Sequence, residues 1–213
     1  MKNLVKSLVV ASALSVAGTA SADWFDCFSP VIGADYYQVW TSPKNSNLNI
    51  RHARDYPGAT IYVGGRADCF GLEVGYDVSA TRSRAFTAGA TSGTTRVQRQ
   101  GWHIDLIGYM PLDCFECVDL FGTIGWGWIQ PRRTFNITSG PALGFATNNN
   151  SRRGNSVLRL GIGANYMFTE CVGARLKLGY ESTSTIRFTG PAGTSYRPFG
   201  DSFTLAVGAF VKF

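Results

Sequence analysis

The residues with the clearest capacity for covalent chemistry are five cysteines, each preceded by an acidic residue: Cys27, Cys69, Cys114, Cys117 and Cys171. Cys114 and Cys117 have the Cys-x-x-Cys spacing of half a zinc site, but no second matched pair exists, so we expect no metal. In an exported chain such cysteines favour disulfides, and an odd number leaves at least one thiol unpaired within the chain. Two intrachain bridges, cross-links between molecules, and isolated thiols all remain open.

Histidines are scarce, which limits the catalytic chemistry available to the chain. A nucleophile needs an adjacent base, and only His52 and His103 are present. His52 stands in a basic stretch where the nearest acid is Asp55. His103 is two residues from Asp105, a spacing that arises in any strand. We therefore predict that the protein is not an enzyme, and we assign no catalytic or cofactor-binding residue.

Alternation of apolar and polar side chains identifies the elements that must position the other charges. Within 70–79 every even-numbered residue is apolar, whereas the odd-numbered residues include Glu73 and Asp77. Similar alternation, weakest in the first segment, runs through 31–40, 59–67, 101–110, 118–129, 157–168, 172–181 and 203–213. The charged residues expected to share the polar side of these strands are Glu73, Asp77, Asp105, Arg159, Arg175, Lys177 and Glu181.

Eight such segments predict an all-β fold, an eight-stranded antiparallel up-and-down transmembrane β-barrel. The interior of a barrel of this size is just wide enough to be filled by side chains. We expect the interior charges to pair there as a polar plug, because an unpaired buried charge costs several kcal/mol, roughly. A narrow ion-conducting path through rearranging charge pairs is the alternative.

The connections between these segments are of two kinds. Those between hairpins are short, whereas those within hairpins, at about 41–58, 80–100, 130–156 and 182–201, are long and polar. Outer-membrane barrels have this asymmetry, with short periplasmic turns and long extracellular loops. The long connections are also rich in arginine, whose guanidinium group binds phosphate bidentately. The candidates for contact with lipopolysaccharide phosphates are Arg132, Arg133, Arg152 and Arg153.

The two ends of the chain predict export and membrane insertion. Residues 1–22 combine basic residues, an apolar stretch and the small residues Ala20-Ser-Ala22, so we expect a signal peptide followed by one barrel domain, 23–213. In 203–213 the odd-numbered residues form an apolar stripe long enough for a tilted strand to cross a bilayer. The chain has no recognisable nucleic-acid-binding motif, and we expect no nucleic-acid partner.

The signal peptide, the eight alternating segments, the asymmetric loops and the terminal Phe213 resemble the OmpA-like family of eight-stranded outer-membrane barrels. The resemblance covers nearly all of 23–213 and implies a location in the cell outer membrane, with membrane lipid and lipopolysaccharide as partners. It also implies that Phe213 belongs to the signal read by the barrel-assembly machinery. We expect no peptidoglycan-binding domain, and the cysteines depart from the family pattern, which leaves disulfide-linked envelope proteins open as partners.

The function expected from this resemblance is structural or surface-interacting: envelope integrity, adhesion, or lipopolysaccharide contact through basic extracellular loops. A small ion or solute channel is the alternative, and a lipid A-modifying barrel enzyme is a weaker one. A soluble lipocalin-like carrier is also eight-stranded, but it would need an apolar interior and a polar exterior.

Overall fold

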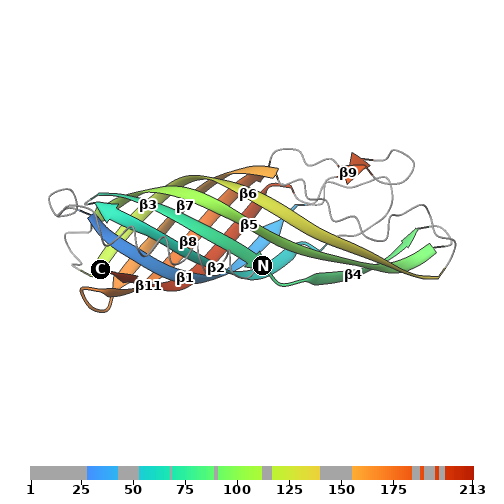
Figure 1. Ribbon diagram of the computed structural model, residues 1–213, viewed down its shortest axis with the longest axis horizontal. Helices are drawn as coiled ribbons and strands as arrows, with labels where there is room; N and C mark the ends of the chain where they lie inside the picture. Colours follow the sequence, from blue (N-terminus) through green and yellow to red (C-terminus); the bar gives the residue numbers. More distant parts are fainter. Residues whose placement is uncertain are drawn as a thin grey trace, which may run out of the picture.

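A computed structural model of the chain describes residues 28–42, 53–67, 69–88, 91–111, 117–139, 155–183, 188–189, 195–196 and 200–213. Eight long strands form the wall of one antiparallel barrel (Figure 1): β1 (Phe28–Thr41), β2 (Asp55–Ala67), β3 (Phe70–Ser79), β5 (Thr91–Pro111), β6 (Val118–Ser139), β7 (Asn155–Met167), β8 (Val172–Thr183) and β11 (Ser202–Lys212). Three shorter strands are β4 (Arg82–Ala88), β9 (Phe188–Thr189) and β10 (Ser195–Tyr196). No helix within the described ranges is long and apolar enough to cross a membrane.

The barrel closes where the first and last strands meet. β1 pairs with β11 from Val31 opposite Lys212 to Thr41 opposite Ser202, and β3 pairs with β5, so the wall is continuous. A closed barrel has no free edge in the membrane, where an unpaired backbone group would be costly. The all-β, eight-stranded antiparallel barrel predicted from the alternation is therefore confirmed.

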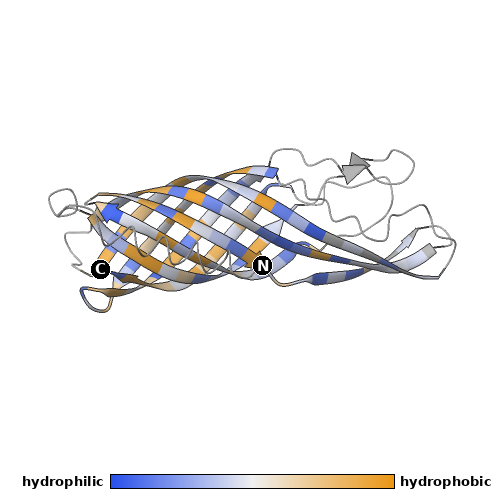
Figure 2. Cartoon of the chain, viewed as in Figure 1, coloured by the Kyte–Doolittle hydropathy of each residue, from blue (hydrophilic) through white to orange (hydrophobic). Residues whose placement is uncertain are grey.

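The barrel wall is apolar outside and polar inside. The even-numbered side chains of β3 face outward and are exposed, whereas Glu73 and Asp77 on the same strand are buried. Ile61 and Ile162 also face outward and are among the most exposed large side chains. Figure 2 shows hydrophobic positions around the barrel wall. This arrangement suits a lipid solvent and is the inverse of a soluble lipocalin-like carrier.

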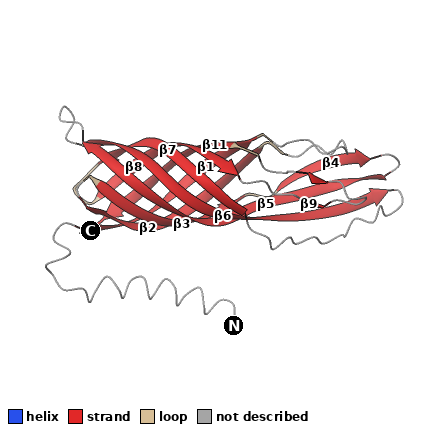
Figure 3. Ribbon diagram, turned by 90° about the horizontal axis from the view of Figure 1, so that it is seen from above, coloured by secondary structure: helices blue, strands red, loops and turns tan. Residues whose placement is uncertain are grey.

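The four expected long loops are wrong in part, because each contains strand residues: 41–58 includes the start of β2, and 182–201 includes β9 and β10. β4, the first half of β5 (91–99) and the second half of β6 (130–139) continue as a three-stranded sheet beyond the barrel end, which we name the blade (Figures 1 and 3). Arg82 pairs with Val97 at its base, and a register shift lies between Ser92 and Gly93. The blade sequence is polar, so it lacks the alternation that marks the strands in the bilayer.

Apolar layers lie on both sides of the polar middle of the lumen. Towards the blade end, Tyr37, Val39, Ala53, Tyr56, Val97 and Ala206 form a buried cluster. Towards the short-turn end, one cluster contains Val31, Tyr62 and Phe210, and another contains Ile107, Tyr109 and Phe121. The charged side chains are therefore enclosed along the barrel axis as well as by its wall.

Glycines make room for the large side chains that fill this narrow bore. Phe121 on β6 is opposite Gly163 on β7, and its ring occupies the space that a Gly163 side chain would need. The ring of Phe210 lies in the same way over Gly173. On the lipid-facing side the requirement disappears, because a side-chain carbon added at Gly108 would meet no atom within 4 Å.

This contrast predicts opposite outcomes for the same substitution on the two faces. Gly163→Ala should destabilise the barrel by about 1–3 kcal/mol, because its new methyl group would overlap the Phe121 ring and the Leu176 carbonyl oxygen. Gly108→Ala is the matched control and should leave stability unchanged or slightly raised. Urea unfolding of the lipid-reconstituted protein, followed by heat-modifiable gel mobility, measures both. Equal losses of stability in the two variants would contradict the packing argument.

Candidate functional site

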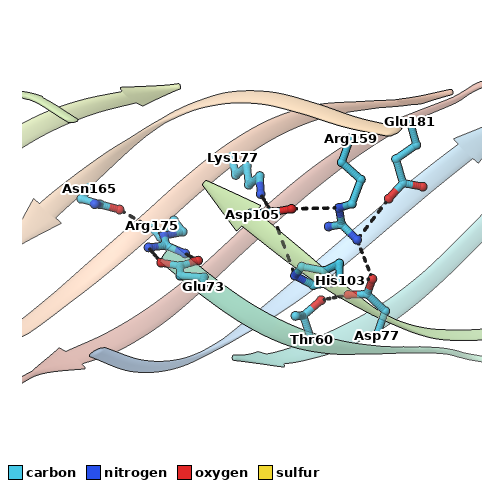
Figure 4. A network of polar contacts seen from close by, with 10 residues as sticks. All are labelled: Thr60, Glu73, Asp77, His103, Asp105, Arg159, Asn165, Arg175, Lys177 and Glu181. Carbon is cyan, nitrogen blue, oxygen red and sulfur yellow. Dashed lines mark hydrogen bonds and ion pairs between the residues drawn. The ribbon is translucent and has the colours of Figure 1, made fainter. Parts of the chain in front are cut away.

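The most distinctive side-chain cluster in the described residues is a network of ion pairs across the lumen (Figure 4). Strand alternation directs its members inward from β3, β5, β7 and β8. The structure brings together all seven residues that the sequence analysis assigned to the polar interior: Glu73, Asp77, Asp105, Arg159, Arg175, Lys177 and Glu181.

Arg175 and Glu73 form a bidentate pair across the barrel. The guanidinium nitrogens Nη1 and Nη2 donate to the two carboxylate oxygens of Glu73 at 2.8 and 2.6 Å. The remaining Nε donates to Oδ1 of Asn165 at 3.2 Å, and the centre of the Tyr62 ring lies 4.6 Å from the guanidinium carbon. Both charged side chains are almost fully buried. Such two-point pairing is strong and fixes the orientation of the guanidinium group.

Arg159 is the centre of the second part of the network. Its Nη1 lies 2.7 Å from Oδ2 of Asp77 and 3.4 Å from Oε1 of Glu181, and its Nε lies 3.6 Å from Oδ1 of Asp105. Lys177 adds a second cation at Asp105, with Nζ 2.6 Å from Oδ2. One guanidinium group thus links carboxylates from three different strands, β3, β5 and β8.

His103 belongs to this network. Its Nδ1 lies 3.1 Å from Oδ2 of Asp77, and its Nε2 lies 4.0 Å from Oδ2 of Asp105. Thr60 donates its hydroxyl hydrogen to the other oxygen of Asp77, so that hydroxyl is already engaged. Both ring nitrogens of His103 therefore face carboxylates, an arrangement that orients the imidazole as a structural bridge.

Sequence reasoning missed Arg99, which it placed in a loop. Arg99 lies in β5, is buried, and pairs with Glu181. The signal was available, because Arg99 shares the odd-numbered parity of His103 and Asp105 on the same strand. Nearer the short-turn end, Arg66 pairs with Asp119 and stacks 4.2 Å from the centre of the Tyr109 ring.

A small cavity adjoins the network. It has a volume of about 40 Å³ and is lined in part by Asp35, Tyr37 and Tyr62. Within the described residues, Oδ1 of Asp35 and the hydroxyl groups of both tyrosines have no hydrogen-bond partner. This volume has room for only a few water molecules, which would satisfy these polar atoms.

Among the described side chains, no group of three or more His, Cys, Asp and Glu is arranged to hold a metal ion.

Two of the four basic candidates, Arg132 and Arg133, lie on the blade and not in the lumen. Arg132 is exposed and lies in β6, so its assignment to a loop is wrong, as is that of Arg133. Arg152 and Arg153 lie outside the described residues. Arg96 on β5 is exposed as well, and the register places it diagonally across from Arg132, because Gln98 is opposite Arg132 and Arg96 is opposite Thr134. Diagonal neighbours of this kind are separated by roughly 7–8 Å.

Aromatic side chains lie below these arginines on the same outward face. Trp102 and Trp126 meet edge to face with ring centres 5.1 Å apart, and Trp128 lies 6.2 Å from Trp126. Tryptophan is enriched where a membrane meets water. The cluster therefore indicates the membrane boundary from which the blade rises.

The remaining candidates lie at the short-turn end of the barrel. Cys69, Cys117 and Cys171 are exposed free thiols, whereas Cys27 and Cys114 lie outside the described residues. Phe213 is exposed, and its backbone N–H donates to the carbonyl oxygen of Pro30 at 2.9 Å. The end of the chain is thus held against β1 next to the barrel closure.

Comparison with known proteins places this architecture in a family. The sequence matches the outer membrane protein beta-barrel domain model over residues 7–213. A search of curated proteins finds no match. Among solved structures, Neisserial surface protein A aligns with a TM-score of 0.53 at 12% identity, covering 88% of this chain and 98% of that one.

Two further structures show the same fold. The outer membrane protein OprG from Pseudomonas aeruginosa aligns with a TM-score of 0.56 at 15% identity, covering 87% of this chain and 95% of that one. A major outer membrane protein from Thermus thermophilus aligns with a TM-score of 0.56 at 11% identity, covering 87% of this chain and 99% of that one. The resemblance to eight-stranded outer-membrane barrels is confirmed: this chain belongs to the outer membrane protein beta-barrel family and is a protein of the outer membrane.

Proposed function

We propose that the protein is a structural surface protein that contacts lipopolysaccharide phosphates through the blade. The observation that carries this proposal is the position of Arg96 and Arg132. Both are exposed, neither makes an ion pair within the described residues, and both continue the face that carries the tryptophan cluster. Two guanidinium groups so close together match the geometry of a phosphate bound by more than one donor.

The height of these arginines above the membrane boundary supports the same partner. Along β6, Arg132 is four residues beyond Trp128, or about 13 Å along the strand, and less in height because barrel strands tilt. Between the tryptophans and these arginines, Gln100 on β5 and Gln130 on β6 are opposite each other. The first polar groups above the boundary are therefore amides and guanidinium groups, which suit sugar hydroxyls and phosphates. The same chemistry fits acidic glycans on a host surface, so adhesion is a related role.

The ends of the chain have proposed roles in biogenesis. Residues 1–22 act as a signal peptide that is removed, and 23–213 form the barrel domain. Phe213 acts as part of the signal for the barrel-assembly machinery. Its exposed ring and its backbone bond to Pro30 support this role, because they place the ring beside the closing strand pair.

A non-enzymatic role fits the lumen as well as the family. The family and the similar structures are named as outer-membrane or surface proteins. The imidazole of His103 is held between two carboxylates. The nearby hydroxyl group of Thr60 already donates its hydrogen bond to Asp77. A nucleophile would instead need a hydroxyl or thiol within reach of the free ring nitrogen. The function proposed for these charges is mechanical bracing of the barrel.

An ion channel is the second candidate, and the cavity beside Asp35 is the observation that favours it. A conducting path would have to pass the ion pairs and both apolar layers. The side chains of these groups occupy the described part of the lumen. We therefore expect no steady conductance from the wild-type protein in planar bilayers. Wild-type conductance that changes on Glu73→Ala or Arg175→Ala would favour the channel.

Removal of the two blade arginines should weaken the contact with phosphate. Lipid A bisphosphate vesicles should stabilise the wild-type barrel relative to phosphatidylcholine vesicles, because each arginine near an anionic surface contributes roughly 1 kcal/mol. The variant R96A/R132A should lose most of this difference, and added salt should reduce it in the wild type. Urea unfolding in the two kinds of vesicle provides the measurement.

Arg82→Ala is the matched control for this experiment. Arg82 lies on the blade but is already paired with Asp55 at 2.6 Å, so its loss should leave the lipid A effect intact. An equal loss of the lipid A effect in both variants, or an unchanged effect in R96A/R132A, would contradict the proposed contact.

The bracing role predicts a strongly non-additive response at the central ion pair. Glu73→Ala alone should destabilise the folded barrel by about 3–5 kcal/mol, because it leaves the Arg175 guanidinium group buried without its carboxylate. Replacing both residues, as in E73L/R175M, should cost much less than the sum of the single changes. Unfolding free energies of the two single variants and the double variant give the coupling. Additive effects would show that the pair does not brace the barrel.

A further inference from the structure

Three cysteines occupy equivalent positions at the short-turn end of the barrel. Cys69, Cys117 and Cys171 come directly before β3, β6 and β8, and all three are exposed. In each case the cysteine carbonyl oxygen accepts a hydrogen bond from the next strand in the barrel wall: from Tyr109 at 2.7 Å, Met167 at 2.8 Å and Lys212 at 2.7 Å. These bonds fix the backbone at each cysteine, so the distances between them follow from the strand register.

The register separates Cys69 and Cys117 beyond the reach of a disulfide. Phe70 is opposite Gly108, and Gly108 is opposite Gly122, so Cys69 is level with Phe121 on β6. Cys117 comes four residues before Phe121 in the chain, which places it about 13 Å from this level in the strand direction alone. A disulfide requires a Cα–Cα distance below about 7 Å.

The other two pairs are excluded for similar reasons. Val118 is opposite Tyr166, and Tyr166 is opposite Ala174, so Cys117 and Cys171 are two strand spacings and two residues apart, about 11 Å. Cys69 and Cys171 precede β3 and β8, which are separated by three strands in either direction around the barrel. No two of these three cysteines can therefore bond to each other in the folded chain.

This geometry narrows the disulfide patterns that the sequence left open. Every intrachain bridge would have to include Cys27 or Cys114, so two bridges consume at most two of the three described thiols. At least one of Cys69, Cys117 and Cys171 has no possible partner within its own chain. In an oxidising compartment an exposed thiol of this kind is available to another molecule.

Strand alternation indicates the direction from which a partner approaches. Cys69, Cys117 and Cys171 share the odd-numbered parity of Gly71, Asp119 and Gly173, which face the lumen, and not that of the lipid-facing residues next to them. The thiols thus surround the mouth of the barrel. A second barrel lying beside this one in the membrane would contact the lipid-facing set, whereas a soluble protein approaching end-on would meet the thiols.

We propose that these rim cysteines link the barrel through disulfides to a cysteine-bearing protein of the periplasm, the compartment that the short turns face. Each link joins one barrel thiol and one partner thiol with loss of two electrons and two protons. A disulfide-carrying thiol oxidant accepts them and is reduced to a dithiol. The covalent link anchors the outer membrane to the periplasmic protein through the barrel mouth.

The test uses the full chain expressed in a Gram-negative cell with an oxidising periplasm. Free thiols are alkylated with N-ethylmaleimide in intact cells, and membrane proteins are separated without reductant. The expected result is a species heavier than the monomer that dithiothreitol converts back to monomer. Mass spectrometry should find Cys69, Cys117 or Cys171 joined to a cysteine of a periplasmic protein. The variant C69S/C117S/C171S should lose this species while keeping heat-modifiable mobility.

A relocated thiol is the matched control. Ser83→Cys in the triple-serine background puts one exposed cysteine on the blade, at the other end of the barrel, and should not restore the heavier species. The proposal is overturned if all three rim thiols label with maleimide without reductant, or if the heavier species persists in the triple variant. A species that contains only two copies of this chain, or blocked thiols on a purely monomeric protein, also overturns it.

Discussion

The narrow bore of an eight-stranded barrel is the constraint on which the rest of this structure depends. The cavity beside the ion pairs has room for only a few waters, so charges on the lumen wall must be neutralised by other side chains. The pairs therefore span the barrel: β3 and β8 lie on opposite walls, and Glu73 and Arg175 join them directly. Arg159 links the same two strands to β5 through its three carboxylates. Neutralising the lumen charges and bracing the wall are thus one physical requirement.

The same lack of space explains the glycines and the apolar layers. Large rings such as Phe121 and Phe210 fit only because the neighbouring strand carries Gly163 and Gly173 beneath them. These rings belong to the apolar clusters that separate the network from the short-turn end. Exclusion of water lowers the local dielectric, which strengthens each ion pair but raises the cost of leaving one partner alone. The side-chain packing that strengthens the ion pairs therefore also closes the lumen.

The sequence predicted the barrel strands well because the bilayer imposes one uniformly apolar face on each of them. Its failures follow from the same cause. Beyond the barrel end, the buried face of β5 carries small or polar residues such as Gly93, Thr95 and Arg99, so β4 and the outer halves of β5 and β6 lack the alternation of apolar and polar residues and were assigned to loops. Arg99 was missed with them. The interior residues could be identified from parity, but the partnership of Glu73 with Arg175 depends on how strands four places apart meet across the lumen. Periodicity along one strand contains no such information.

The positions of residues at the two ends of the barrel are set by the strands that the ion pairs hold together in the middle. Because β5 and β6 continue without interruption from the tryptophan cluster into the blade, the height of Arg96 and Arg132 above the membrane is set by strand register. At the other end, the same register fixes Cys69, Cys117 and Cys171 too far apart to react with one another. In a flexible loop, each guanidinium group or thiol could have moved to find a partner within its own chain. Held by the sheet, the guanidinium groups of Arg96 and Arg132 and the three thiols stay exposed at opposite ends of the barrel.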